Sequence, residues 1–190
     1  VVLDTGIDVD HSHFGADIDG NGISDRIVAS VDFTGTKLSG NDGNGHGTHV
    51  SGIIASSDTQ FPGIVPNADI ISLKVLTDSG RGSFSNINKA LNWCIENADN
   101  YNIASINMSL GDGTFSEEEI SDGYSSKQLA ALNALGVSVI SASGNSFYNS
   151  KVGVSYPSSD ANSFSIGALF HSDVGSVYGA YSTDVDRLAP

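Results

Sequence analysis

Short segments rich in β-branched apolar residues alternate along this chain with segments whose apolar residues recur at helical spacing. The strand-like segments are residues 1–3, 27–33, 70–75, 103–107, 137–141 and 164–168, and the helix-like segments are residues 46–55, 84–98 and 126–135. Strands of this kind, separated by helices, favour a parallel sheet that helices cover on both faces. We therefore predict an α/β fold of three layers, doubly wound around a mostly parallel sheet.

No repeat or linker interrupts the sequence, so residues 1–190 are expected to form a single domain. Apolar residues make up 39% of the chain, which allows a sizeable core, and the 22 glycines indicate many tight turns. Gly136 is placed to end the third helix-like segment in a left-handed conformation. Ser116 and Glu119 have the spacing of a capping box, which predicts the start of one more helical segment.

The charge of the chain argues against one class of partner. Its 22 acidic residues outnumber the 8 basic ones and give a net charge of −14. This disfavours nucleic acid, whose phosphates attract basic surfaces, and suits solubility in a salty or extracellular setting. No apolar run is long enough to span a bilayer, so we expect no membrane partner. Cys94, the only cysteine, lies in an apolar stripe at helical spacing and is expected to be a buried core thiol.

Asp4 directly follows the first strand-like segment, in the string Asp4-Thr5-Gly6. In parallel sheets, reactive groups collect beyond the carboxyl ends of the strands. A partly buried carboxylate there accepts the Nδ1–H of a histidine and fixes its tautomer, although a lone Asp-Thr-Gly is also an ordinary turn. Asp78-Ser79-Gly80 is a second string of this type and raises the alternative of two carboxylates sharing one proton. We reject that dyad because the fold that carries it is all-β.

The string His46-Gly47-Thr48-His49 opens a helix-like segment after a Gly-containing turn. A histidine at such a helix start, beside a cleft, is placed to act as a general base within about 3 Å of a hydroxyl. His49 lies one turn further on and is predicted to be a packed structural histidine. Zinc binding by the two histidines is less favoured, because the usual zinc-binding helix reads His-Glu-x-x-His and a third ligand is needed.

Asn145 follows the strand-like segment 137–141 in the string Ser143-Gly144-Asn145. An asparagine NH₂ on a glycine turn can donate to a developing oxyanion, whereas Gly-Asn alone would be an ordinary turn. Asp4 and Asn145 both follow strand ends and are therefore expected at the same edge of the sheet. An acid, a histidine and an amide donor are most of the groups that acyl transfer to a serine requires.

Together these strings resemble the subtilisin-like serine proteases, or subtilases, and the resemblance extends through essentially the whole chain. The matching segments are residues 2–8, 45–52, 63–66, 73–76, 106–111, 143–145 and 188–190. The resemblance implies a secreted, extracellular protease with peptide or protein substrates. It implies that Asp4 is the triad acid, that His46 is the general base and that Asn145 is the side-chain donor to the oxyanion.

The same resemblance implies which residues hold the substrate. Two extended edges are implied to pair with the substrate backbone as added strands. The first edge consists of Gly80, Arg81 and Gly82, and the second consists of Ser109, Leu110 and Gly111. Phe84 matches an aromatic residue that lines a subsite for the non-primed side of the substrate. Because Arg81 replaces a usually small residue, we hypothesise that it favours an acidic substrate side chain.

The nucleophile that the resemblance implies is expected outside these residues. Subtilases carry their serine in Gly-Thr-Ser-Met-Ala, beyond an Ala-Pro such as Ala189-Pro190, and that string does not occur here. We therefore expect a subtilase catalytic domain that is incomplete at both ends, inactive as these 190 residues and active as the full protein. The alternative is a non-catalytic subtilase-like domain that binds extended peptides at the two edges.

An inserted Asp/Gly-rich loop, residues 15–25, lies between Asp4 and His46. Its oxygen donors are spaced as in the first nine positions of an EF-hand calcium loop, with Gly22 at the turn. The donors are Asp17, Asp19, Asn21, Ile23 (through its carbonyl) and Asp25. Val28 stands where an EF-hand has its bidentate glutamate, so the match is partial. A calcium site and a solvated turn both remain open interpretations of this loop.

Overall fold

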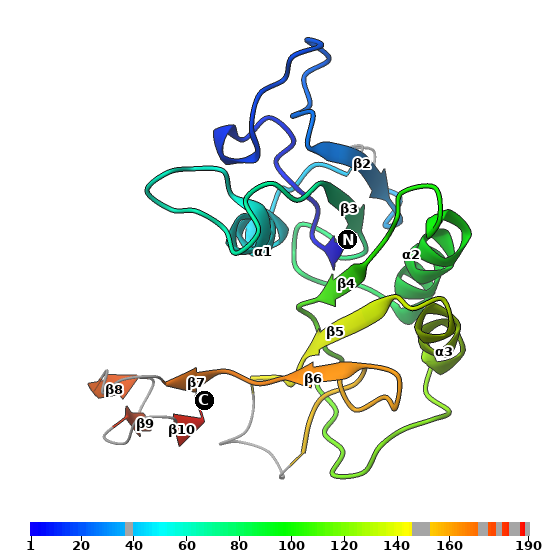
Figure 1. Cartoon of the computed structure of the whole chain (residues 1–190). Coiled ribbons are helices and arrows are strands. Elements are labelled where there is room, and N and C mark those ends of the chain that lie inside the picture. Colours follow the sequence, from blue (N-terminus) through cyan, green and yellow to red (C-terminus); the bar gives the residue numbers. More distant parts are fainter. Residues whose placement is uncertain (37–39, 146–152, 171–174, 178–179, 183–186, 189–190) are drawn as a thin grey trace.

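Six parallel strands form the central sheet of the protein (Figure 1). The computed structural model describes residues 1–36, 40–145, 153–170, 175–177, 180–182 and 187–188. The strands of the sheet are β1 (Val2–Asp4), β2 (Ile27–Asp32), β3 (Ile70–Lys74), β4 (Ser105–Met108), β5 (Ser138–Ala142) and β6 (Phe164–Ile166). Their order is β2-β3-β1-β4-β5-β6. From β1 the chain crosses to β2 at one edge of the sheet, returns inward through β3, and then passes β1 to run outward through β4, β5 and β6. β1 therefore lies in the interior of the sheet, and in such folds ligands bind beyond the carboxyl ends of the strands.

Helices cover both faces of this sheet. They are α1 (His46–Ala55), α2 (Phe84–Asn97) and α3 (Ser126–Ala134), with one short 3₁₀ turn, η1 (Ser12–Phe14). Figure 1 shows α2 and α3 side by side on one face and α1 on the other. The predicted three-layer α/β arrangement is therefore confirmed. No helix in the described part of the chain is long and apolar enough to cross a membrane.

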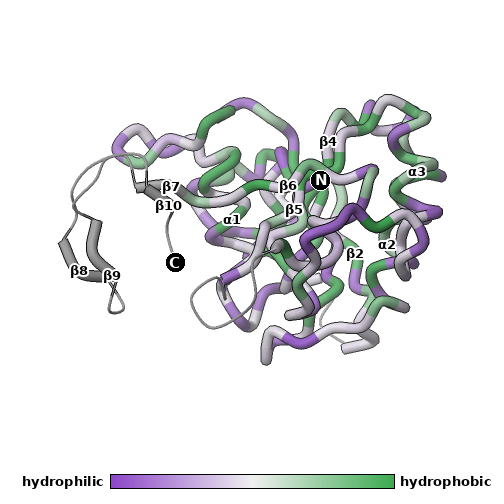
Figure 2. The backbone as a smooth tube through the Cα atoms, turned by 90° about the horizontal axis from the view of Figure 1, so that it is seen from below, coloured by the Kyte–Doolittle hydropathy of each residue, from purple (hydrophilic) through white to green (hydrophobic). Residues whose placement is uncertain are grey.

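The main hydrophobic core lies between the sheet and the helices α2 and α3. In α2 the buried residues recur at positions 87, 90, 91 and 94, which is one face of a helix, and Ser83 caps its first turn through the amide of Asn86. Figure 2 shows hydrophobic and hydrophilic stretches alternating along both helices, as expected for helices that cover a core with one side. Cys94 is fully buried in this cluster, as predicted. Each large aliphatic side chain buried here contributes about 1.5–3 kcal/mol to folding.

A smaller core lies under α1. Its buried members are Ile7, Phe14, Ile27, Ala55 and Ile70. The helix turns Gly47, Ser51 and Ala55 inward at a spacing of four residues. The prediction that His49 is packed is wrong, because this residue lies off that face; it is exposed and lines a separate surface cavity.

The predicted elements are confirmed with ends that differ by at most two residues, and Gly136 has the expected left-handed conformation (φ 78°). No helix follows Ser116, contrary to the capping-box prediction. Ser116 instead pairs with Val154 in an isolated antiparallel bridge, through hydrogen bonds of 3.0 Å in both directions. Four short strands beyond β6 were not predicted, and they form two antiparallel pairs (Figure 1). They are β7 (Leu169–Phe170) with β10 (Arg187–Leu188), and β8 (Gly175–Val177) with β9 (Ala180–Ser182).

Candidate active site

The end of β1 and the start of α1 bring Asp4 and His46 together. The Nδ1 atom of His46 lies 2.8 Å from Oδ1 of Asp4, which also accepts the amide of Thr5 at 2.7 Å. The side chain of Asp4 is 1% exposed, whereas that of His46 is 49% exposed. With Asp4 ionised, Nδ1 carries the donated proton and the other ring nitrogen, Nε2, is left as a base. The pair thus has the geometry of a buried acid orienting an accessible histidine.

Glycine at position 47 makes this approach possible. A Cβ atom at Gly47 would lie 2.2 Å from the carbonyl oxygen of Gly6 and 3.1 Å from the Cβ of Asp4. Any side chain would therefore push the first turn of α1 away from the end of β1. The Gly47 amide also donates to the Thr5 hydroxyl at 2.9 Å, which joins the helix start to the residue after the acid.

Asp42 supplies the N-terminal cap that α1 lacks at Gly45. Its Oδ2 accepts both the amide and the hydroxyl of Thr48, at 2.9 and 2.6 Å. Its Oδ1 accepts the Thr5 hydroxyl and the amides of Asn44 and Gly45, at 2.9–3.0 Å. Burial acts to raise the pKa of Asp42, but the hydrogen bonds from Thr48 and the turn outweigh it and hold the pKa below its ordinary value. One carboxylate thus joins the segment that carries Asp4 to the segment that carries His46.

A cleft of about 630 Å³ opens beside His46. All the residues predicted to hold substrate line it, namely Gly80, Arg81, Gly82, Phe84, Ser109, Leu110 and Gly111. The first three belong to a tight loop in which the amide of Thr77 donates to the Arg81 carbonyl at 2.8 Å and Gly82 bridges to Leu76. The structure therefore brings both predicted edges and the predicted base to one cleft, although the roles of these residues remain predictions.

Two tyrosines that the sequence did not single out extend the aromatic surface around Phe84. Tyr124 stacks on Phe84 with ring centroids 4.7 Å apart, and Tyr156 meets Phe84 edge-on at 5.5 Å. The Tyr156 hydroxyl accepts the amide of Ser125 at 2.7 Å, which fixes this ring. Phe84 and Tyr156 both line the cleft. Tyr156 lies far along the chain from Phe84, so no local pattern in the sequence links the two.

The structure does not bring every predicted site residue to the cleft. Asn145 is exposed at a bend just beyond β5, and its role as a donor stays a prediction. Asp78, the acid of the rejected dyad, forms an ion pair with Lys74 at 2.7 Å, while Asp4 is paired with His46. Asn44, Asp112 and Thr5 also line the cleft and were missed.

The inserted loop between η1 and β2 projects from the body of the molecule (Figure 1). Carboxylate oxygens of Asp17, Asp19 and Asp25 lie within 4.8 Å of one another, and all three residues are exposed. The amides of Gly22, Asn21 and Gly20 donate to the carboxylate of Asp17. These hydrogen bonds lower the pKa of Asp17, and the one from Gly22 has the largest effect. Three of the five predicted ligands are thus gathered in one place with the oxygen chemistry that calcium prefers.

Comparison with known proteins adds an independent finding. The model of the "Subtilase family" matches residues 1–187. Subtilisin DY from Bacillus licheniformis is 28% identical over an alignment that covers the whole chain and 62% of the relative. Subtilisin Savinase from Lederbergia lenta is 35% identical over 87% of the chain and 57% of the relative. The thermostable alkaline protease of Halalkalibacterium halodurans is 32% identical over 87% of the chain and 43% of the relative.

Solved structures show the same similarity. Sphericase matches with a TM-score of 0.69 at 28% identity, covering 98% of this chain and 57% of the other. The S41 psychrophilic protease matches with a TM-score of 0.68 at 30% identity and the same coverage. The chain spans about half the length of the relatives that it matches, between 40 and 62% among those with sequence matches.

Proposed function

The chain belongs to the subtilase family, and from that premise we propose that the protein hydrolyses peptide bonds as a serine endopeptidase of the subtilisin type. The observation that carries the proposal is the 2.8 Å contact between Nδ1 of the accessible His46 and the buried Asp4, where His46 lines a cleft that both predicted substrate edges also line. An acid that is shielded from water and a histidine that is open to it match the roles of orienting group and base.

Each group has a defined role in the proposed reaction. Nε2 of His46 takes the proton from a serine hydroxyl as that oxygen attacks the substrate carbonyl, and the ionised Asp4 stabilises the imidazolium that forms. His46 then returns the proton to the leaving amine as the peptide C–N bond breaks, and in a second step His46 takes a proton from water, which attacks the acyl-serine ester, releases the acid product and restores the serine. Asn145 and a backbone amide donate to the tetrahedral oxyanion. We place the serine itself in the Gly-Thr-Ser-Met-Ala string that is expected beyond Pro190.

The test requires protein that continues through that serine. Such protein should hydrolyse a tetrapeptide anilide and should lose activity on treatment with phenylmethylsulfonyl fluoride, which converts a reactive serine to a sulfonate ester and releases fluoride. His46→Ala should abolish turnover, while His49→Ala, a change on the same helix, should leave it in place. Residues 1–190 alone should be inactive, and hydrolysis by that piece would contradict our assignment of the nucleophile.

A non-catalytic peptide-binding domain is the second candidate. It is favoured by one observation, that the cleft with both edges is formed by residues of this chain alone. If the sequence downstream lacks the serine, the protein should bind extended peptides at the two edges without cleaving them. Binding of a tetrapeptide in the absence of turnover, measured by calorimetry, would support this candidate over the enzyme.

The position of Arg81 adds a proposal about substrates. Its side chain is exposed in the edge loop that lines the cleft, where a guanidinium can pair with a carboxylate. The enzyme should therefore prefer peptides with an acidic residue on the non-primed side. Arg81→Ala should remove that preference, which is expected to be small because the ion pair is partly solvated. Hydrolysis of neutral peptides, which form no such pair, should stay within about twofold. Unchanged preference in this variant would contradict the proposal.

We also propose that the inserted loop binds calcium and that the protein acts outside the cell. The gathered carboxylates of Asp17, Asp19 and Asp25 support the first proposal, since hard divalent cations prefer oxygen ligands. Binding there would neutralise part of the negative charge that these three residues concentrate on the loop. The net charge of −14 is compatible with an extracellular setting.

A further inference from the structure

Lys74 is the one lysine whose side chain is fully buried among the described residues. It lies at the end of β3, in register with Asp4 on β1 and with Asp32 on β2. Its Nζ donates to the carbonyl oxygen of Thr5 and to Oδ1 of Asp78, the latter at 2.7 Å. A buried ammonium is costly unless it is paired and hydrogen-bonded, so these two partners hold Lys74 in a single arrangement.

These two partners belong to two different parts of the site. Thr5 directly follows Asp4, so the bond to its carbonyl fixes the backbone beside the predicted triad acid. Asp78 lies in the loop that leads to Gly80–Gly82, the first predicted substrate edge. The amide of Gly80 donates to the carbonyl of Thr77 at 2.8 Å, which makes Asp78 part of the same tight turn as the edge.

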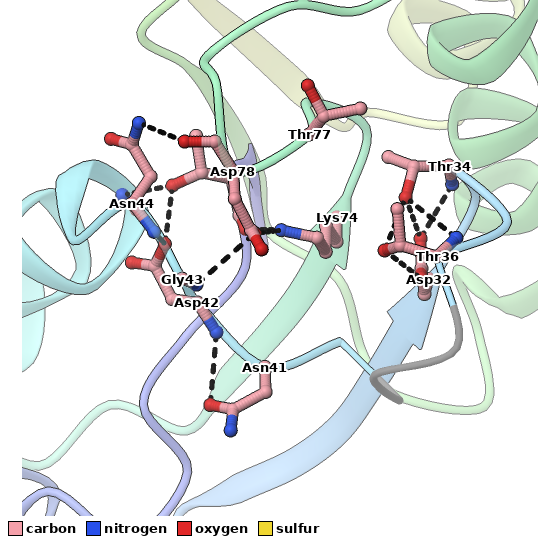
Figure 3. A network of polar contacts seen from close by, with 12 residues as sticks. Asp32, Thr34, Thr36, Asn41, Asp42, Gly43, Asn44, Lys74, Thr77 and Asp78 are labelled. Carbon is pink, nitrogen blue, oxygen red and sulfur yellow. Dashed lines mark hydrogen bonds and ion pairs between the residues drawn. The ribbon is translucent and has the colours of Figure 1, made fainter.

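Asp78 also contacts the turn that precedes His46 (Figure 3). Its Oδ1 accepts the Gly43 amide at 3.3 Å, and its carbonyl accepts Nδ2 of Asn44 at 2.8 Å. Oδ1 of Asn44 in turn accepts the His46 amide at 3.3 Å. A Cβ atom at Gly43 would lie 2.4 Å from Oδ2 of Asp78, so the two segments are packed as closely as glycine allows.

We infer that Lys74 and Asp78 are positioning residues that couple occupation of the Gly80–Gly82 edge to the alignment of His46. A substrate strand that pairs with the edge restrains the loop holding Asp78. Asp78 transmits that restraint to the turn before His46, and Lys74 anchors Asp78 to the backbone beside Asp4. Neither residue touches the reacting atoms in this inference, which rests on the proposed peptidase function.

The coupling predicts a dependence on substrate length. A tetrapeptide anilide reaches the edge, whereas a single-residue ester does not, so only the tetrapeptide gains from the restraint. Asp78→Ala should lower kcat for the tetrapeptide about tenfold, the size of effect expected from a displaced base, and should change kcat for the ester by about threefold or less. Asp78→Asn keeps an oxygen that can accept from Lys74 and Gly43, and it should restore most of the tetrapeptide rate.

Two control variants keep the test decisive. Asp58→Ala removes another carboxylate that accepts loop amides, those of Gln60 and Phe61. This variant should leave kcat for both substrates unchanged. If Asp78→Ala fails to fold because it leaves Lys74 without its carboxylate, then Lys74→Met/Asp78→Ala removes the buried charge as well. This double variant should fold and should show the same loss with the tetrapeptide.

The outcomes separate the inference from the function on which it rests. Equal losses of kcat for the tetrapeptide and the ester would show that Lys74 and Asp78 only support the structure. A rise in KM with kcat unchanged would show that Asp78 affects only substrate binding at the edge. Either result overturns the coupling. A wild-type protein that hydrolyses neither substrate would instead overturn the proposed function. In that case the coupling is read from the His46 ring resonances in NMR, which should shift on addition of the tetrapeptide in the wild type but not in Asp78→Ala.

Discussion

The amide and the hydroxyl of Thr48 both donate to the same oxygen of Asp42, at 2.9 and 2.6 Å. This pair anchors the first turn of α1 at a point where Gly45 offers no capping side chain. Because the other oxygen of Asp42 holds the hydroxyl of Thr5, the same carboxylate sets the distance between the strand end and the helix start. The alignment of Asp4 with His46 therefore depends on a residue that touches neither of them.

Asp42→Ala should destabilise the protein and weaken catalysis together. Loss of a helix cap with charge-assisted bonds should lower the free energy of unfolding by about 2 kcal/mol, measured by urea denaturation. Asp25→Ala, a change of an exposed carboxylate in the inserted loop, is the matched control and should have little effect when calcium is absent. Full stability in Asp42→Ala would show that Gly45 and the Thr48 hydroxyl suffice to start α1.

The stabilisation from Asp42 should also disappear in acid. The folded pKa of Asp42 lies below its ordinary value of about 3.9, so the unfolded chain takes up the proton first as the pH falls. The contribution is therefore complete above the ordinary pKa and is lost as the pH falls through the folded pKa. The difference in melting temperature between wild type and Asp42→Asn should be constant near neutral pH and should shrink below about pH 4. A difference that grew in acid would show the sign of the shift to be wrong.

Local patterns in the sequence explain why the fold and the acid–histidine pair could be predicted. Asp4 and His46 each stand at the junction of a strand or helix with a glycine-rich turn, and in a parallel sheet such junctions gather at one edge. No local sequence pattern indicates the hydrogen-bond networks of Asp42 and Lys74. Asp42 acts on Thr5 and Lys74 acts on Asp78 only after the fold has brought them together.

Two wrong predictions also show that local sequence patterns do not report contacts made only in the folded protein. Ser116 and Glu119 have the spacing of a capping box, but the backbone of Ser116 pairs with that of Val154 instead of starting a helix. The local sequence does not indicate this partner. His49 is predicted to be packed because its spacing from His46 does not fit a zinc site, yet the inward face of α1 repeats through Gly47, Ser51 and Ala55. Because these buried residues are small, they form no stripe of large apolar side chains, and the sequence therefore does not show which face of α1 points inward.

Cys94 should be unreactive in the native protein. Burial raises the pKa of the Cys94 thiol to about 12, so almost no thiolate forms at mildly alkaline pH. Ellman's reagent should therefore react with Cys94 in denaturant but not in buffer. Because the unfolded thiol ionises near its ordinary pKa of about 8.5, wild type should lose stability relative to Cys94→Ala as the pH rises above that value. Rapid labelling of native protein would mean that α2 opens readily from the sheet.

Calcium should bind the inserted loop through the carboxylates of Asp17, Asp19 and Asp25. Calorimetry should show heat of binding in the wild type and none in Asp19→Ala. Asp10→Ala, a change of an exposed carboxylate outside the loop, should bind as the wild type does. Equal heats in all three proteins would exclude this loop as the site, and no heat in any of them would favour the solvated turn.

Replacing Asp4 by asparagine should separate the geometry of the acid from its charge. Asparagine keeps the size of the side chain, so the fold should survive, but its neutral amide no longer stabilises the imidazolium or enforces the Nδ1–H tautomer of His46. The expected loss in kcat is about 10⁴-fold near neutral pH, with KM for a tetrapeptide nearly unchanged, since the two substrate edges are intact. The measurement is steady-state hydrolysis by the full-length protein, with Asp10→Asn as the control for a neutralised carboxylate. A loss that appeared mainly in KM would place Asp4 in substrate binding rather than in orienting the base, and the proposed triad would then need another acid.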